Sequence, residues 1–460
     1  MSAHAQLVPM THDAGADALP WLAGADAEPL FCGPAPLRRD AFRARAQALA
    51  MRLPEAPAVI NLCERRDHFI LGFCAALLRG QTTLLPPARA PGVVADVARL
   101  HPGSYRLGDA ASTLDCDIRV DLEIAGDSAV GMAGFSDVLA PTLPALVAFT
   151  SGSTGTPGAH AKTWGALVQT TAANLRALAD LFGGDSASIL ATVPPQHMYG
   201  IEMSVLLPLL GPFSVHPGRP FWPQDIAAAL AGCAAPRLLV TAPVHLRALL
   251  QADVVVPPLA AIATATAPLP VELAAAAEDR FGCEVRELFG ATETCVIAQR
   301  RTARDSAWRL FEDVVLHPHA DGTRVERPAL PQPVQLADLV EQVEVEGGRG
   351  FVLRGRQADV LEIAGKRASL ADLTRNLQAL AGVRDAAMLQ LDPDAAGVRR
   401  LVAFIATDAT LDDAAILAAL RERCDPVFLP RRIIRVERLP RNETGKLPRA
   451  ALLALLGAAE

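Results

Sequence analysis

Short hydrophobic runs alternate with helix-length stretches over most of this chain. Between about residues 40 and 345, β-branched or aliphatic runs alternate with Ala/Leu-rich segments. The apolar run 146–149 leads into a Gly/Ser/Thr loop and a predicted helix from about Trp164 to Leu181, and the run 237–240 precedes another predicted helix. This alternation is typical of parallel sheets wrapped by helices, so the region is predicted to be α/β.

The pattern changes near Arg354. A helix is predicted from Ser369, which can cap it with Asp372 as a capping-box partner, to Gly382. Strands are predicted at 386–391, 401–406 and 432–436, with a helix at 412–424. These elements make a compact α+β module of about a hundred residues, a common domain size. We place the boundary near Gly355 and predict a large N-terminal domain, 1–355, and a small C-terminal domain, 356–460.

Composition and charge narrow the functional class. The chain has 460 residues, of which 51% are hydrophobic and 20% charged, as expected of a globular protein with two or three domains. The net charge of −7 is spread along the chain, and no basic block is present to track a phosphate backbone. We therefore expect no nucleic-acid partner.

The cysteines and apolar stretches indicate a reducing compartment. The eight cysteines are scattered and form no CxxC pair of the kind that zinc or redox sites use. No basic start followed by an apolar run resembles a secretory signal, and the apolar stretches are short or broken by Pro and Gly. We expect a soluble, cytoplasmic protein without membrane insertion.

Three local motifs carry candidate chemistry. The first, TSGSTGTPG at 150–158, follows an apolar strand. Its glycines allow close backbone approach, and the hydroxyls of Ser151, Ser153 and Thr154 add donors for phosphate oxygens. It has neither a Gly-Lys-Ser/Thr ending nor GxGxxG spacing, so it matches neither of the commonest nucleotide loops. A loop of this composition is also a common turn.

The other two motifs lie further along the chain. FGATET at 289–294 puts a carboxylate beside a hydroxyl and a tight turn, a set of hard oxygen ligands that suits Mg²⁺, although a turn glutamate is also common on surfaces. In LPRNETGKLPR at 439–449, Lys446 lies in a turn before the last predicted helix, from where a mobile cation can reach a developing charge on phosphate. A loop lysine is also often only solvated surface.

The order of these motifs resembles that of the adenylate-forming (AMP-binding) superfamily, which includes acyl- and aryl-CoA synthetases. The resemblance covers roughly residues 60 to 450, and its further matches are the acyl-pocket helix start VPPQHMYG, the adenine-side loop ATATAPLP and the hinge region LRGRQADVLEIAGKR. The chain is shorter than most relatives. Its compact form, with GKRASLADL after the hinge, is most similar to ligases of aryl-polyene and xanthomonadin-type pigment clusters.

The resemblance implies roles for individual residues. ATP phosphates would be bound by the phosphate loop, at Thr150, Ser151, Gly152, Ser153, Thr154 and Gly155. Thr292 and Glu293 would bind the α-phosphate and Mg²⁺, and Phe289 would lie near the adenine. Asp338 and Arg356 would approach the ribose. His197, Tyr199 and Ala265 would line the acid site, and His197 is also compatible with a structural role.

Departures from the family pattern bear on the same sites. Gly158 stands where the phosphate loop usually has lysine, and Lys162 is a candidate substitute for that cation. Ala358 stands at the hinge position that is most often aspartate. The adenine-side loop carries Ala263, Thr264, Ala265 and Thr266 where glycines are usual.

The chemistry implied is activation of a small carboxylic acid. Its oxygen attacks the α-phosphorus of MgATP, pyrophosphate leaves, and Lys446 screens the crowded anions. A small mobile C-terminal domain then rotates, and the acyl group passes to the thiol of CoA or of a phosphopantetheine on a separate acyl carrier protein. The alternative is a degenerate adenylation fold that serves as a nucleotide-binding or scaffold protein. A compact aromatic acid is favoured by His197, Tyr199 and the small residues of the adenine-side loop.

Overall fold

The chain folds into two compact units in the computed structural model. It describes residues 18–122, 134–150, 158–182, 186–356, 360–363, 366–392, 399–407, 411–424, 426–442 and 445–458. Unit 1 holds the residues up to Asp305 together with Phe311–Asp313 and Arg327–Gln332, and unit 2 holds Ser306–Leu310, Val314–Glu326 and the residues from Pro333. The predicted mobile domain, 356–460, lies within unit 2, and its separate movement stays a prediction.

Unit 1 contains two sheets whose central strands are parallel, as predicted. The strands of the first sheet are, in spatial order, β10 (Gly158–Thr163), β9 (Pro144–Thr150), β5 (Thr82–Leu85), β4 (Ala58–Asn61), β6 (Tyr105–Gly108) and β7 (Ile118–Arg119). All neighbours in this sheet pair in parallel except β10 with β9. The phosphate-loop motif therefore lies between two antiparallel strands at the edge of the sheet.

The second sheet of unit 1 carries three further candidate segments: VPPQHMYG, ATATAPLP and FGATET. Its strands are, in spatial order, β16 (Cys295–Arg300), β15 (Glu284–Ala291), β14 (Ala261–Thr264), β13 (Arg237–Thr241), β11 (Ala187–Ala191), β12 (Phe213–Val215), β2 (Pro29–Phe31) and β3 (Leu37–Arg38). From β15 to β2 the pairing is parallel. A short pair, β1 (Leu19–Pro20) with β8 (Val138–Leu139), lies apart from both sheets.

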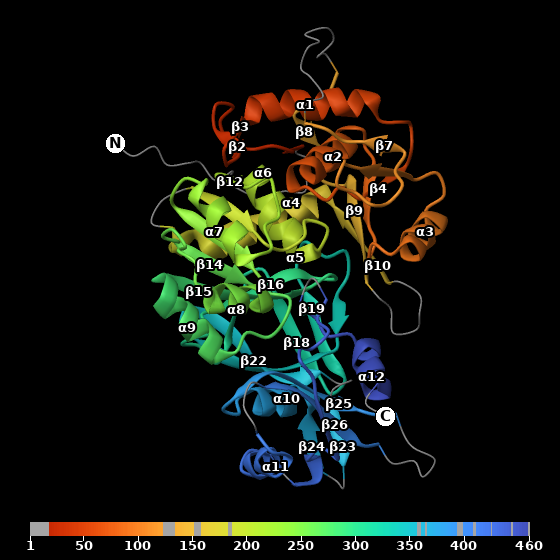
Figure 1. Ribbon diagram of the computed structural model, residues 1–460. Coiled ribbons are helices and arrows are strands. Elements are labelled where there is room, and N and C mark those ends of the chain that lie inside the picture. The colour runs from red at the N-terminus through yellow and green to blue at the C-terminus, as the bar shows by residue number, and fades with distance from the viewer. Residues whose placement is uncertain are drawn as a thin grey trace. The chain divides into compact units, whose positions relative to one another are not determined.

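Helices cover these sheets. They are α1 (Arg39–Arg52), α2 (Arg66–Leu78), α3 (Pro91–Leu100), α4 (Trp164–Leu178), α5 (Met198–Ile201), α6 (Leu207–Leu210), α7 (Pro223–Ala231), α8 (Pro243–Gln251) and α9 (Val271–Phe281). A 3₁₀ turn follows α4 at Ala179–Leu181, and a π-helical turn, Glu202–Leu206, joins α5 to α6. Figure 1 shows α7, α8 and α9 beside β14 and β15, and their leucines and alanines share one buried cluster with those strands.

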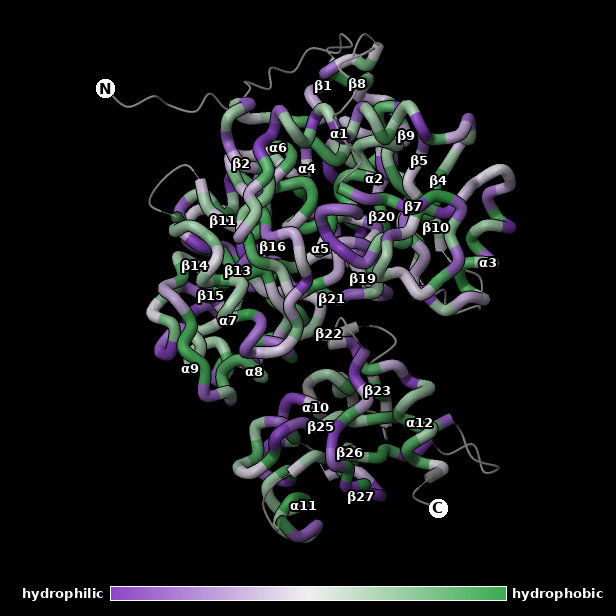
Figure 2. The backbone as a smooth tube through the Cα atoms, turned by 45° about the horizontal axis from the view of Figure 1, so that its top comes forward, coloured by the Kyte–Doolittle hydropathy of each residue, from purple (hydrophilic) through white to green (hydrophobic). Residues whose placement is uncertain are grey.

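Local sequence explains where several helices begin and end. The Thr163 hydroxyl accepts from the Ala166 N–H at 3.2 Å and caps α4, and Gly282 ends α9 in the left-handed conformation. Helix α2 is buried on nearly every side, because apolar residues surround its axis. Its tube carries mostly the hydrophobic colour in Figure 2.

Unit 2 is built mainly from antiparallel pairs. β17 (Trp308–Leu310), β22 (Gly348–Arg356) and β21 (Asp338–Val345) are neighbours, and β18 (Val315–His319), β19 (Gly322–Glu326) and β20 (Val334–Leu336) form a second sheet. The expectation of parallel sheets up to residue 345 is therefore wrong beyond β15. The hairpin connections after this strand hold no crossover helix, and a parallel pair needs one.

The remainder of unit 2 matches the predicted α+β module. Its elements are β23 (Val360–Ile363), β24 (Lys366–Ser369), α10 (Leu370–Gln378), β25 (Val383–Gln390), β26 (Leu401–Thr407), α11 (Asp413–Arg421), a 3₁₀ turn at Pro426–Phe428, β27 (Arg432–Arg435) and α12 (Arg449–Ala458). Leu373 and Leu377 of α10 pack with β25 and β26 in one core. No helix among the described residues combines the length and the apolarity needed to cross a bilayer.

Candidate active site

The ends of two sheets bring the first two motifs together in unit 1. Thr150 ends β9, and its hydroxyl lies 3.2 Å from Nε2 of His160 on the neighbouring strand β10. The same ring nitrogen lies 3.4 Å from Oε1 of Glu293, in the turn between β15 and β16. The start of the phosphate-loop motif and the predicted metal carboxylate are therefore linked through one histidine. The loop residues Ser151, Gly152, Ser153, Thr154 and Gly155 lie outside the described residues.

Lys162 also reaches the turn that carries Glu293. Its side chain is buried, with the residue 5% exposed, and its ammonium group donates to the backbone carbonyl of Glu293. Burying a lysine costs free energy unless its charge is hydrogen-bonded. The hydrogen bond to the Glu293 carbonyl therefore stabilises the buried ammonium group. The predicted role of Lys162 as a phosphate-loop cation stays a prediction, and the structure places its charge beside the metal turn.

The backbone of the turn is held by further polar groups. The Thr294 hydroxyl accepts from the Ala291 N–H at 3.2 Å and donates to the Cys295 carbonyl at 2.9 Å. Arg327 donates to the carbonyls of Thr294 and Val296 at 3.2 and 2.9 Å, and Asp313 pairs with its guanidinium at 2.7 Å. These contacts fix the backbone, so the Glu293 carboxylate projects from a rigid base.

Two residues show how tightly the turn is folded. A Cβ atom on Gly290 would lie 2.3 Å from the Cys295 carbonyl oxygen, so only glycine allows the two chains of the turn to approach this closely. Cys295 has a φ of 62°, a left-handed conformation that is uncommon outside glycine. Strain of this kind collects at functional sites, where the surrounding structure holds it in place.

Electrostatics favour the neutral form of His160, the neighbour of Glu293. Burial and the nearby Lys162 charge lower the pKa of His160, and the Glu293 charge opposes them only in part. His160 is therefore a neutral imidazole near pH 7. Magnesium uses one or two carboxylates and keeps several waters, so Glu293, with the hydroxyl of Thr292 beside it in sequence, fits this ion. No group of three or more His, Cys, Asp or Glu side chains suited to a metal occurs among the described residues.

The acid-side residues lie at the start of a short helix. His197 precedes α5 and Tyr199 lies within it, where burial raises the pKa of the Tyr199 hydroxyl well above its ordinary value and keeps it protonated. A Cβ on Gly200 would lie 1.9 Å from the Pro194 carbonyl oxygen, so α5 packs directly on the segment before it. Arg66, fully buried on α2, donates to the carbonyls of Ala191 and Val193 at 2.9 Å and anchors that segment.

The adenine-side loop follows β14. Ala265 is buried, and the next residue, Thr266, has a φ of 80° although its side chain is β-branched. Such a residue is an outlier at positive φ, which agrees with the glycine expected at this position. Phe289 is half-buried in β15, the neighbouring strand.

In unit 2 the two predicted ribose-side residues are cross-strand partners. Asp338 begins β21 and lies directly opposite Arg356 of β22. The backbone carbonyl of Asp338 also accepts from the Thr323 hydroxyl at 2.7 Å. Two residues that are 18 positions apart in the sequence are thus neighbours, although the hinge residue Ala358 and the side chain of Arg356 lie outside the described part.

The loop that carries Lys446 is clamped within unit 2. The Asn442 side chain accepts from the Lys446 N–H at 2.9 Å, and the Asn442 N–H donates to the Lys446 carbonyl at 2.8 Å. Arg441 forms two hydrogen bonds of 2.8 Å with Asp385 and a third, of 3.0 Å, with the carbonyl of Gly445. Lys446 itself is exposed, and its role as a catalytic cation stays a prediction.

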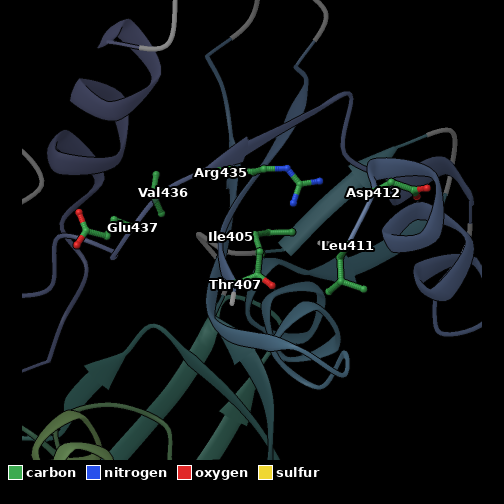
Figure 3. A pocket seen from close by; sticks show the side chains of 7 residues that line it. All are labelled: Ile405, Thr407, Leu411, Asp412, Arg435, Val436 and Glu437. Carbon is green, nitrogen blue, oxygen red and sulfur yellow. The ribbon is translucent and has the colours of Figure 1, made fainter. Parts of the chain in front are cut away.

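A surface hollow of about 620 Å³ in unit 2 lies apart from these residues. Figure 3 shows its lining, which consists of Ile405, Thr407, Leu411, Asp412, Arg435, Val436 and Glu437. It contains none of the predicted site residues. Arg435 pairs with Asp413, so its charge is already neutralised.

Three buried or half-buried residues of the site were missed by sequence reasoning: His160, Glu202 and Arg327. They lie in three separate segments, and the sequence alone does not indicate that they lie near Glu293. The one available signal was a charge inside an otherwise apolar run, as at Glu202 in IEMSVLL.

Comparison with known proteins agrees with this geometry. A family model described as AMP-binding enzyme matches residues 113–326. The chain is 32% identical over 281 residues to a 4-coumarate–CoA ligase from Rhodobacter capsulatus, a match that covers 60% of this chain and 66% of that protein. It is 30% identical over 315 residues to a 4-coumarate–CoA ligase from Halorhodospira halophila, which covers 65% of this chain and 73% of that protein.

The fold has solved counterparts. The o-succinylbenzoate CoA synthetase from Bacillus subtilis, in complex with ATP and magnesium ion, has a TM-score of 0.75 and 17% identity, and the match covers 90% of this chain and 94% of that chain. This likeness shows the same α/β architecture, with a large N-terminal and a smaller C-terminal domain. Because the sequence relatives match over most of their length, the chain belongs to the AMP-binding enzyme family of adenylate-forming enzymes.

Proposed function

We propose that this protein is an ATP-dependent acid–thiol ligase that forms an acyl-adenylate and passes the acyl group to a pantetheine thiol. The observation that carries the proposal is the contact chain from Thr150 through His160 to Glu293. It joins the strand that enters the phosphate loop to the turn that carries the metal carboxylate, and these segments are more than 130 residues apart.

The residues divide the work of adenylation. The phosphate-loop donors and Thr292 bind the phosphates, and Glu293 holds Mg²⁺, which neutralises charge on the phosphate oxygens when bound. Alignment and charge neutralisation then supply most of the acceleration, because the acid's own oxygen attacks the α-phosphorus and pyrophosphate leaves. His160 stays neutral beside Glu293, so it does not compete with the metal for that carboxylate.

Lys446 supplies the cation for this first half-reaction. Its loop is rigid at the backbone while its side chain is exposed, so the ammonium group can reach a bound phosphate or carboxylate. For the second half-reaction, we propose that movement of the C-terminal domain withdraws Lys446 and admits the thiol.

The proposed acid is a compact aryl carboxylic acid, and the proposed acceptor is CoA or a separate acyl carrier protein. Two matched relatives are 4-coumarate–CoA ligases, which supports an aryl acid and a CoA thiol. The small Ala265 and the buried Tyr199 at the acid side agree with a compact ring.

The direct test is acid-dependent exchange of labelled pyrophosphate into ATP, measured over a panel of aryl and fatty acids. We expect exchange with at least one aryl acid. Absence of exchange across the whole panel, with ATP binding intact, would refute the ligase and favour the nucleotide-binding scaffold. The acceptor is then assigned by supplying CoA or a phosphopantetheinylated carrier protein to the active acid.

A further inference from the structure

A carboxylate is buried between the acid-side helix and the metal turn. Glu202 is 1% exposed and begins the π-helical turn that directly follows α5. A π-helical turn inserted in an α-helix is rare and frequently occurs at functional sites. A buried carboxylate is costly unless its oxygens accept hydrogen bonds, so its partners indicate what it holds.

Those partners lie on two other elements. Glu202 Oε2 accepts from the Asn174 side chain of α4 at 3.1 Å. Both carboxylate oxygens accept from the backbone N–H of Val296, at 3.2 and 3.0 Å. Val296 is three residues beyond Glu293 and lies opposite Gly290 across the β15–β16 pair. Glu202 therefore connects the helix of Tyr199 to the backbone of the metal turn.

Two buried cations complete the arrangement. Burial raises the pKa of the Glu202 carboxyl, and its hydrogen bonds together with the charges of Arg327 and Lys162 offset this only in part. Both cations also bind carbonyls of the same turn. Three charged side chains from three separate segments thus hold the turn: Lys162 at the Glu293 carbonyl, Arg327 at the Thr294 and Val296 carbonyls, and Glu202 at the Val296 N–H. Their charges offset one another within the interior, which makes burying each of them less costly.

We propose that Glu202 is a positioning residue that ties α5, and with it His197 and Tyr199, to the turn that carries Glu293. The inference rests on the proposed function. In this arrangement the position of α5 relative to the Glu293 carboxylate is fixed. A displacement of α5 is transmitted to Glu293 through Val296.

The test is a substitution that keeps the shape of the side chain. In Glu202→Gln, one of the two acceptor oxygens becomes an NH₂ group, which would face the N–H of Val296 or the amide of Asn174. The matched control is Glu287→Gln. Glu287 is also buried and accepts from the Leu269 N–H, Arg300 and Thr302 at 3.0, 2.8 and 2.6 Å, but it does not contact the residue 291–296 backbone.

The readout is binding of α,β-methylene-ATP, measured by calorimetry with Mg²⁺ and again in EDTA. We expect Glu202→Gln to lower the affinity measured with Mg²⁺ by about tenfold, the size of one lost charged hydrogen bond, and to leave the affinity in EDTA unchanged. We also expect faster hydrogen exchange at the Val296 amide. Glu287→Gln is expected to lower thermal stability without changing the ratio of the two affinities.

A second arm tests the connection to α5. Gly200→Ala displaces α5 from Pro194, so it should lower the Mg²⁺-dependent affinity in the wild-type background and have little further effect in Glu202→Gln. The inference would be overturned if the effects of Gly200→Ala and Glu202→Gln on affinity were additive. It would also be overturned if the ratio of the affinities with Mg²⁺ and in EDTA were unchanged in Glu202→Gln, or if it changed equally in Glu287→Gln. If wild-type protein bound no nucleotide, the proposed function would fail instead, and the two failures are thus distinguishable.

Discussion

Replacing Lys162 by methionine is expected to weaken binding of the metal–nucleotide complex. The substitution keeps an unbranched apolar side chain in the buried position and removes the ammonium group that donates to the Glu293 carbonyl. A hydrogen bond from a charged donor contributes about 1.5–3 kcal/mol. If bound Mg²⁺ must reorder the loosened turn, this loss lowers the affinity roughly ten- to a hundredfold.

The same substitution should change the titration of His160. Burial and the Lys162 charge lower the pKa of His160, so removing the charge raises that pKa toward its ordinary value. The weaker metal binding and the raised His160 pKa have one origin, which is the loss of the Lys162 charge. Protonation of His160 in the variant would then bring a positive charge next to Glu293 and weaken metal binding further at mildly acidic pH.

The assays are calorimetry with α,β-methylene-ATP and Mg²⁺, and an NMR titration of His160 assigned with the variant His160→Gln. Arg280→Met is the control, because it removes an exposed cation of α9 that donates to the Val254 carbonyl, and it should leave the His160 titration unchanged. An unchanged His160 pKa together with wild-type affinity in Lys162→Met would refute the reasoning.

Three further outcomes can be measured. Lys446→Ala should reduce adenylate formation about 10²–10³-fold, as for other donors to developing charge. It should spare thiolysis of a supplied acyl-adenylate and leave the melting temperature unchanged, and equal loss of both half-reactions would contradict the assigned role. Gly200→Ala should raise the KM for the acid in pyrophosphate exchange, because its Cβ would overlap the Pro194 carbonyl, whereas Gly92→Ala, whose Cβ meets nothing within 4 Å, should not. Because folded His160 binds a proton less readily than the unfolded chain does, it should lower the free energy of unfolding as pH falls below about 6.5, and His160→Gln should reduce this slope in denaturant titrations.

The hydrophobic pattern predicted individual helices and strands well, because each of them depends on one short segment of sequence. The strand before the phosphate loop is observed as β9, the helix predicted from Trp164 is α4, and the apolar run 237–240 lies in β13. The α+β elements after Arg354 also agree with the prediction within a few residues. Strand direction was predicted less well, since an apolar run looks the same in parallel and antiparallel sheets, and β17 to β22 pair antiparallel.

The sequence by itself determined the family and named the candidate reactive residues, because the order of TSGSTGTPG, FGATET and LPRNETGK is a property of the chain. Tertiary structure alone decided which groups surround Glu293. Lys162 belongs to β10, Glu202 follows α5 and Arg327 follows β19, so they come from segments far apart in the sequence and meet at one turn. A buried charge is stable only beside partners that neutralise it, and such partners are chosen by proximity in the fold rather than by spacing along the chain.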